Sequence, residues 1–334
     1  MNTFGRLYVI NIFGESHGES LGIVIDGVPA GIPLKNSDFE EDFTRRKSGA
    51  KGTTPRRESD IPRIMSGLFN GHTTGAPMAV IFENTSARSG DYSVLKEILR
   101  PGHADFTASR KYGGYQDYRG GGHFSGRLTL GLVAAGVIAK KIIDPVVVTA
   151  NLMEAGGSSD IESAVERAVE QQDSIGGIVE CRISGVPVGL GEPFFDSVES
   201  VMSHMVFSIP AIKGIEFGSG FRAAKMRGSE HNDNIADTDG TTETNHAGGI
   251  NGGITNGNEI IFRVAVKPTS STHQPQRTMN FKTGEMEQLT IEGRHDTCIA
   301  LRVPVVVEAA AAIVMADFML QSQEITRIPK PKTE

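Results

Sequence analysis

Cysteine and tryptophan are scarce in this 334-residue sequence, which has two cysteines and no tryptophan. Cys181 and Cys298 are too few and too far apart to build a disulfide framework or a zinc site. The first residues, MNTFGRLYVINIFG, lack the basic start, long apolar segment and small-residue cleavage site of a secretory signal. We therefore expect a protein of the reducing cytoplasm.

Long apolar segments are also missing. No run of eighteen uninterrupted apolar residues occurs, and the longest apolar stretch, 303–320, carries Glu308 and Asp317. This stretch predicts a buried helix and no contact with a membrane.

A strongly basic composition is the third absence. The net charge is −7, and only 6% of the residues are aromatic. Nucleic-acid-binding domains are usually basic, and single-strand binders interleave aromatic and basic residues, so binding to nucleic acid is not expected. The segment 44–57 nevertheless has six basic residues and no acidic one. It is either a solvated charged loop or a site that gathers small anions such as phosphates.

Glycine is abundant, with 40 residues, or about 12% against a usual share of roughly 7%. Many of them gather beside charged and hydroxyl residues in 112–127 and 245–259. Such clusters are typical either of tight turns or of loops whose backbone N–H groups approach an anionic ligand.

The hydrophobic pattern mixes strands and helices without a regular βα repeat, which favours the α+β class. A capping box, Ser159 followed by Glu162, predicts a helix start. We expect one domain, residues 1–325, followed by a flexible tail, 326–334. The expected strands are 7–12, 21–26, 78–84, 145–152, one within 176–191 and 259–268, and the other expected helices are 128–143 and 303–320.

Three histidines lie in unusual surroundings: His17 in GESHG, His103 in RPGHAD and His295 in GRHD. None belongs to a pair with zinc-ligand spacing, so no metal site is predicted. The FGSG segment at 217–220 does not fit the nucleophile elbow of hydrolases. What remains is either a structural turn histidine or an acid that donates a proton to a leaving phosphate.

Four stretches, in this order along the chain, resemble the chorismate synthase family. They are GESHGESLGIVIDGVPAGIPL, RPGHAD with YGGYQDYRGGG, KPTSS at 267–271, and GRHDTCIALRVPVVVEA at 293–309. The resemblance extends from about residue 4 to residue 320.

This resemblance implies a single-domain β-α-β sandwich that assembles as a homotetramer. It also implies the conversion of 5-enolpyruvylshikimate 3-phosphate to chorismate, a loss of phosphate and a ring hydrogen without net redox change. The cofactor would be reduced FMN. Some members of the family regenerate it with NADPH, so a flavin reductase activity is an alternative to test.

The resemblance also implies roles for single residues. His17 would protonate the departing phosphate, and His103 would lie near the flavin pyrimidine ring. Ser16 and Asp296 would relay the proton at flavin N5. Substrate anions would be bound by Arg46, Lys51, Arg127 and Arg294. Flavin contacts would come from His123, Phe124, Ser125, Pro210, Ala211, Gly252, Lys267, Pro268, Thr269, Ser270, Ser271 and Arg294.

The chain departs from the common family pattern in two places. Where many members read Gly-Arg-Ser-Ser-Ala-Arg-Glu-Thr, residues 122–129 read GHFSGRLT, so His123 and Phe124 replace a cation and a hydroxyl. Ser125 and Arg127 keep their identities. The loop 45–54 is about one residue shorter than usual, and Lys51 stands where an arginine is common.

Overall fold

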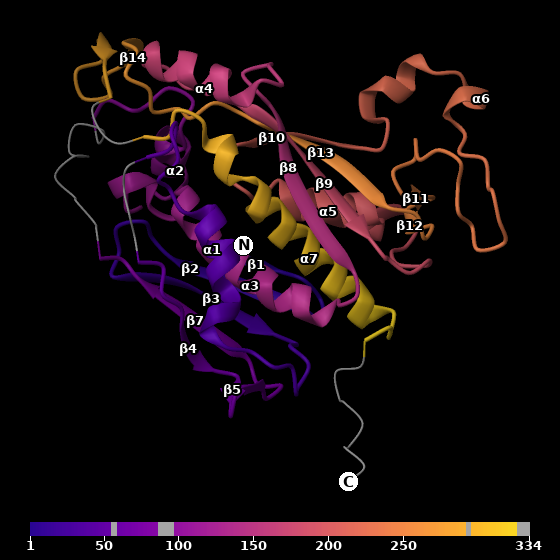
Figure 1. Ribbon diagram of the computed structural model, residues 1–334. Helices are drawn as coiled ribbons and strands as arrows, with labels where there is room; N and C mark the ends of the chain where they lie inside the picture. The colour runs from indigo at the N-terminus through magenta and orange to yellow at the C-terminus, as the bar shows by residue number, and fades with distance from the viewer. Residues whose placement is uncertain (55–58, 86–96, 292–294, 326–334) are drawn as a thin grey trace.

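Two antiparallel sheets face each other across a layer of helices in the computed structural model, which describes residues 1–54, 59–85, 97–291 and 295–325 (Figure 1). In spatial order, the five-stranded sheet consists of β1 (Thr3–Phe4), β2 (Val9–Gly14), β3 (Ser20–Asp26), β7 (Met78–Glu83) and β4 (Arg63–Ser66). The four-stranded sheet consists of β10 (Ile212–Phe217), β13 (Ile260–Val266), β9 (Gly177–Ser184) and β8 (Val147–Ala155).

Alternating side chains explain why one face of each sheet is buried. In β13, Ile260, Phe262, Val264 and Val266 are buried, and the residues between them are half-buried. The register pairs Phe262 with Cys181, so buried side chains of neighbouring strands share one face. The predicted strands are confirmed, with the first beginning at Val9.

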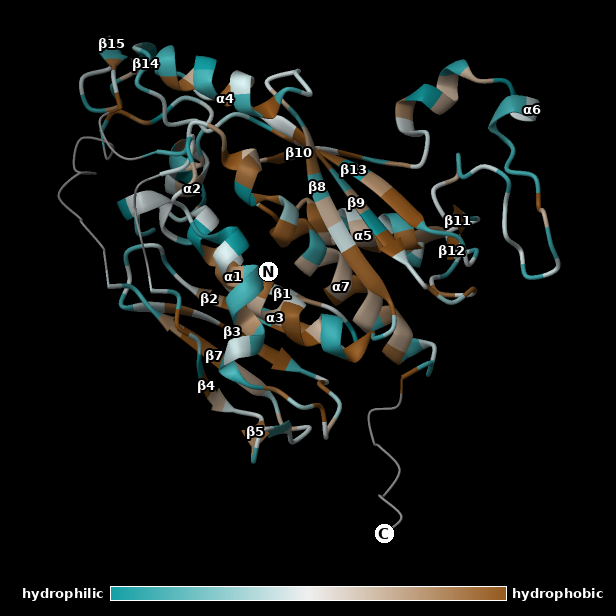
Figure 2. Cartoon of the chain, viewed as in Figure 1, coloured by the Kyte–Doolittle hydropathy of each residue, from teal (hydrophilic) through white to brown (hydrophobic). Residues whose placement is uncertain are grey.

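Helices α3 (Thr129–Ile142) and α7 (Pro304–Gln321) form the layer between the sheets, and Figure 2 shows how apolar both are. Helix α3 packs on β3, α7 packs on β8 and β9, and the two helices pack against each other. A Cβ at Gly136 would lie 2.3 Å from the Cβ of Ala309, so glycine is what allows this close approach. By length and composition α7 could cross a membrane, but 89% of it is buried inside the protein, as predicted for 303–320.

The remaining α helices are α1 (Glu40–Arg46), α2 (Asp105–Lys111), α4 (Ile161–Glu170), α5 (Val198–Val206) and α6 (Gly228–His231). Among them, α1 packs on α3 and α7, α5 packs on α7 and β10, and α4 packs on β8. The 3-10 turns are η1 (Asn36–Phe39), η4 (Arg119–Phe124), η5 (Gly126–Leu128), η6 (Phe194–Asp196), η7 (Gly220–Lys225) and η8 (Ile299–Arg302). Three two-stranded ribbons complete the fold: β5 (Leu68–Phe69) with β6 (His72–Thr73), β11 (Ile250–Asn251) with β12 (Ile254–Thr255), and β14 (Gln276–Met279) with β15 (Met286–Leu289).

The start of α4 corrects one detail. The predicted helix is present, but its N-cap is Asp160, whose carboxylate accepts a hydrogen bond from the backbone N–H of Ser163 at 3.2 Å. The predicted Ser159–Glu162 capping box is therefore wrong by one residue. Aspartate serves as well as serine at this position because either side chain can accept from an otherwise unpaired N–H group.

One hydrophobic cluster runs through both sheets and the helices between them. A buried ionic group lies inside it: Glu308 of α7 accepts hydrogen bonds from Arg45, from Lys140 at 2.9 Å and from the backbone N–H of Ala150 at 2.8 Å. These layers confirm the α+β class and the β-α-β sandwich. The tail 326–334 lies outside the described residues.

Candidate active site

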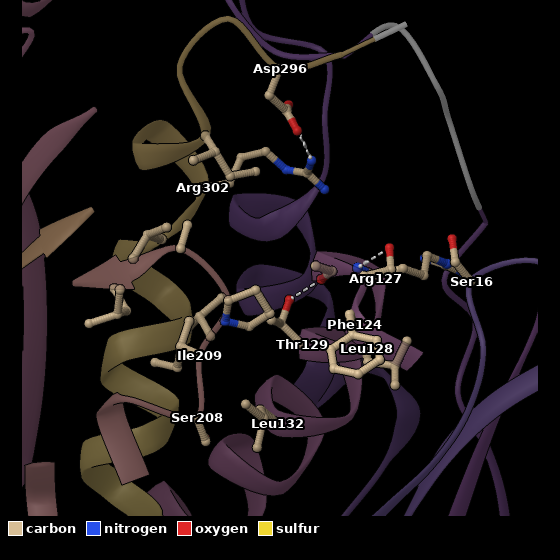
Figure 3. Close-up of a pocket in the computed structure, with 18 of the residues that line it drawn as sticks. Ser16, Phe124, Arg127, Leu128, Thr129, Leu132, Ser208, Ile209, Asp296 and Arg302 are labelled. Carbon is tan, nitrogen blue, oxygen red and sulfur yellow. Dashed lines mark hydrogen bonds and ion pairs between the residues drawn. The ribbon is translucent and has the colours of Figure 1, made fainter. Parts of the chain in front are cut away.

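A cavity of about 1210 Å³ lies between the two sheets (Figure 3). Its walls come from the turn after β2, the end of α1, the η4–η5 segment, the start of β10, the segment after β13, and η8. Segments far apart in the sequence therefore meet in one place, and they include most of the residues that the sequence singled out.

Within the glycine run 120–122, two glycines lie against the imidazole rings of His17 and His103. All three glycines have positive φ angles of 58°, 83° and 53°. A Cβ at Gly120 would lie 2.3 Å from Cε1 and Nδ1 of His17, and one at Gly121 would lie 3.4 Å from the ring of His103. Since only glycine combines this backbone with such close approach, the run fixes the places of both rings.

His17 is 6% exposed, and its Nδ1 lies 3.2 Å from the Oγ of Ser16. Ser16 and Gly120 line the cavity, whereas His17 does not, so the imidazole adjoins the cavity wall rather than forming it. A proton leaving His17 would reach the cavity most directly through the Ser16 hydroxyl, which can accept and donate at once.

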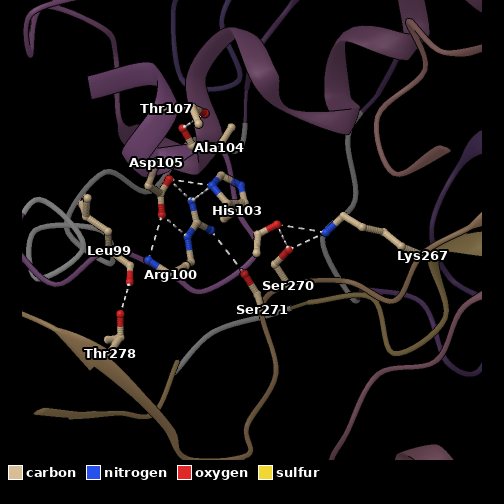
Figure 4. Close-up of polar contacts among 11 residues, drawn as sticks. Leu99, Arg100, His103, Ala104, Asp105, Thr107, Lys267, Ser270, Ser271 and Thr278 are labelled. Atoms are coloured by element: carbon tan, nitrogen blue, oxygen red, sulfur yellow. Dashed lines mark hydrogen bonds and ion pairs between the residues drawn. The ribbon is translucent and has the colours of Figure 1, made fainter. Parts of the chain in front are cut away.

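His103 belongs to a charged group at the start of α2 (Figure 4). Its Nδ1 lies 2.6 Å from Oδ1 of Asp105 and 3.1 Å from Nη2 of Arg100. The shorter contact favours an Nδ1–H that donates to Asp105, which leaves Nε2 for the cavity. Burial alone would raise the pKa of Asp105, but hydrogen bonds from Arg100 and His103 and their charges hold that pKa far below its ordinary value.

Two buried arginines share one buried carboxylate. Asp60, 4% exposed, binds Nη1 of Arg127 with Oδ1, and binds Nη2 of Arg46 with Oδ2 at 2.9 Å. Burial is the largest influence on Arg46; together with the charges of Arg302 and Arg127 it outweighs Asp60 and lowers the pKa of Arg46 to about 10. On another side of the cavity, Nη1 of Arg302 lies 3.1 Å from Oδ2 of Asp296 (Figure 3).

The segment 267–271 has the donors that a phosphate needs. Nζ of Lys267 donates to the carbonyl of Gly102 at 3.0 Å and to Oγ of Ser270 at 2.7 Å (Figure 4). Burial and the nearby charge of Lys213 lower the pKa of Lys267. Nζ of Lys267 has a carbonyl and a hydroxyl but no carboxylate as partner, and the buried Oγ1 of Thr269 has no hydrogen-bond partner, among the residues that the structure describes. An anion at this point would relieve all three groups.

The other expected contact residues divide into three groups. Those that line the cavity are His123, Phe124, Ser125, Pro210, Ala211, Pro268 and Ser271. Those that do not line it are Gly252, on the β11–β12 turn, and Lys51, whose ammonium pairs with Glu166. Arg294 and residues 55–58 of the basic segment lie outside the described residues.

His123, which stands where the family commonly has a cation, makes two polar contacts that connect separate segments. Its Nδ1 lies 2.8 Å from the carbonyl of Gly14, and its Nε2 lies 3.2 Å from Oδ1 of Asn2. A carbonyl oxygen only accepts, so Nδ1 donates to Gly14, and Nε2 forms a hydrogen bond with Asn2 when the amide is turned so that its NH2 group faces the ring. His123 therefore ties η4 to the end of β2, and Phe124 presents a 38% exposed ring at the cavity.

Sequence reasoning missed Asp60, Arg302 and Lys213, all of which line the cavity. Arg302 could have been found from the sequence, because it is a single cation within the apolar stretch that leads into α7. For Asp60 and Lys213 the sequence offers none, since only the fold brings them beside their partners.

The chain is similar to one family throughout its length. The sequence profile described as chorismate synthase matches residues 8–320. A chorismate synthase of Chitinophaga pinensis is 65% identical over 331 residues, covering 99% of this chain and 100% of the relative. One of Dehalococcoides mccartyi is 44% identical over 361 residues, covering 98% of this chain and 99% of the relative. A crystal structure of chorismate synthase superposes with a TM-score of 0.73 at 25% identity, covering 96% of this chain and 93% of that chain.

Proposed function

The chain belongs to the chorismate synthase family, and on that premise we propose how its cavity carries out the family's reaction. Its activity is that of a lyase that forms chorismate in the shikimate pathway from a small-molecule substrate. The reaction breaks a C–O bond to phosphate and a ring C–H bond, and the electrons of the C–H bond form the new ring double bond. The protein must therefore bind a polyanion, supply a proton and keep water away.

The observation that carries the proposal is the cationic wall of the cavity. Arg46, Arg127 and Arg302 line the cavity, and among the described lining residues the carboxylates are Asp60 and Asp296, each paired with one or two of these arginines. The substrate 5-enolpyruvylshikimate 3-phosphate has one phosphate and two carboxylates. Each charge-assisted hydrogen bond to such a group contributes roughly 1.5–3 kcal/mol, so three arginines suffice for tight binding.

The family uses a flavin, and we propose that it is reduced FMN, bound beside the substrate. The residues present fit its phosphate: the ammonium groups of Lys267 and Lys213 offer donors, and the Oγ1 of Thr269 is buried without a partner among the described residues. Phe124 and Pro210 give apolar contacts for a ring system. When bound, the reduced flavin supplies the electron-rich centre that assists departure of phosphate.

His17 supplies the proton for the leaving phosphate, and Ser16 passes it into the cavity. Phosphate near the imidazole favours its protonated form, as required of an acid at neutral pH. Asp296 accepts a hydrogen bond from the backbone N–H of Thr54 at 2.9 Å and pairs with Arg302, so its carboxylate is fixed at the cavity wall. There it is available to receive the proton that comes from the substrate ring.

We also propose a single catalytic domain, residues 1–325, acting as a homotetramer in the cytoplasm. NADPH is proposed as an external or self-supplied reductant. The continuity of one hydrophobic cluster through both sheets supports the single domain.

Anaerobic turnover tests the function. Reduced FMN with 5-enolpyruvylshikimate 3-phosphate should give chorismate and inorganic phosphate in equal amounts, whereas oxidised FMN alone should give neither. Adding NADPH with oxidised FMN shows whether the protein reduces its own flavin. Absence of product with reduced FMN would refute the proposal.

A second candidate function is hydrolysis, because the structure brings a serine hydroxyl and a histidine ring together. Ser219 Oγ lies 2.9 Å from Nδ1 of His246. Asp233, however, accepts from the backbone N–H groups of His246 at 2.7 Å and Ala247 at 2.8 Å, not from the imidazole ring. Because no described carboxylate bonds to the imidazole ring, this pair is a turn contact rather than a catalytic triad.

A further inference from the structure

Asp60 stands out because one carboxylate serves two arginines of the cavity. Its side chain is 1% exposed, and those of Arg46 and Arg127 are 4% and 7% exposed. The three groups lie on separate segments: the end of α1, the residues before β4, and η5. No other described carboxylate pairs with either arginine.

Each of the two guanidinium groups has one buried nitrogen that is not hydrogen-bonded to any described residue. Nε of Arg46 and Nη2 of Arg127 are buried and have no hydrogen-bond partner anywhere in the described structure. Buried donors of this kind are rare and costly unless a ligand satisfies them. Because the cavity is lined by both arginines, an anionic ligand there is the partner that suits them.

The backbone of Asp60 fits a dedicated role. Its φ angle is +50°, in the left-handed region that aspartate and asparagine enter more readily than most residues. Burial alone would raise the pKa of Asp60, but the charges of Arg46 and Arg127 and their hydrogen bonds lower it. The carboxylate is therefore ionised when the cavity is ready to bind.

We propose that Asp60 is a positioning residue that holds Arg46 and Arg127 side by side as a clamp for an anionic group of the substrate. This inference rests on the proposed function, since it assumes that the cavity binds the substrate. Asp60 acts through the two arginines: it offsets the repulsion between the two cations and holds them at the cavity wall, where their remaining donors are left for a ligand. Without it, the arginines would separate and the clamp would lose its geometry.

The test is an equilibrium titration of the full-length protein, in the presence of oxidised FMN, with 5-enolpyruvylshikimate 3-phosphate. Asp60→Asn keeps the size and tolerates the same backbone, but its amide cannot accept from both arginines. We expect Kd to rise roughly ten- to hundredfold, the loss of one charge-assisted contact. Under turnover, KM should rise in parallel while kcat changes far less.

Asp42→Asn is the matched control. Asp42 is also buried, 7% exposed, and pairs with Lys140 at 2.8 Å and Arg45 at 3.5 Å, but it does not line the cavity. It should reduce stability without changing Kd. If Asp60→Asn does not fold, Asp60→Glu replaces it, and its extra methylene should displace the clamp and weaken binding severalfold.

Three outcomes are decisive. A raised Kd for the Asp60 variant with an unchanged Kd for the Asp42 variant supports the clamp. Equal Kd values for wild type and the Asp60 variant, or equal weakening by both variants, overturn it. Failure of the wild type itself to bind the substrate would instead refute the proposed function.

Discussion

Replacing Gly120 by alanine should disable the site by moving His17. The new Cβ would lie 2.3 Å from Cε1 and Nδ1 of His17 and 3.0 Å from Oγ of Ser16. Ordinary contact begins near roughly 3.5 Å, so the imidazole has to move by about 1 Å. A displacement of that size can reduce a rate by about a hundredfold. The φ of +58° adds backbone strain of about 1–2 kcal/mol.

The expected result is a fall of about a hundredfold in kcat together with a lower Tm. Anaerobic turnover with reduced FMN and thermal unfolding measure the two effects. Gly114→Ala separates them, because Gly114 has a φ of +84° but no atom of the described residues lies within 4 Å of the added Cβ. It should lower Tm with little effect on kcat. Wild-type turnover by the Gly120 variant would refute the claim that this glycine places His17.

Two further variants test the roles of Lys51 in substrate binding and of Glu308 in stability. Lys51→Ala should leave KM for the substrate unchanged, because its side chain is 62% exposed and pairs with Glu166; a raised KM would show that Lys51 reaches the substrate. Glu308→Gln should lower the free energy of unfolding by about 3 kcal/mol at pH 7, since Lys140 and Arg45 lose their shared buried partner. Although burial alone would raise the pKa of Glu308, Arg45 and Lys140 lower it, so the difference should be full above the ordinary glutamate pKa of about 4.3 and should shrink as pH falls below it and through the lower pKa of the folded state. Urea unfolding of wild type and variant at pH 7 and at pH values below about 4.3 measures the difference in unfolding free energy. A difference that does not change with pH would contradict its ionic origin.

Much of the fold could be predicted because many of its strands and helices have a hydrophobic pattern that is visible in consecutive residues. The alternation in 259–268 and the apolar run 303–320 each identify an element, β13 and α7, from neighbouring residues alone. The capping box failed because Ser159 and Asp160 are equally good caps, and only the chain direction before α4 decides between them. Short ribbons such as β5–β6 have too few residues to show a period.

The site was predictable only where chemistry is concentrated in motifs. His17, His103 and the segment 267–271 could be singled out from their neighbours in the sequence. Asp60 could not, because its partners lie 14 and 67 residues away along the chain and nothing local marks the pairing. The family resemblance implied substrate binding by Lys51, whereas the side chain pairs with Glu166 and does not line the cavity, and a match of sequence position alone does not tell which side of a loop faces a cavity.

Chemical rescue of His17→Ala tests most directly the claim that His17 is the acid for the leaving phosphate. The variant should release phosphate about 10²–10⁴-fold more slowly than wild type under anaerobic conditions with reduced FMN. Added imidazole should restore part of the rate, and the rescue should fade well above about pH 7, where imidazole loses its proton. Phosphate release by the variant at the wild-type rate, without imidazole, would contradict the account.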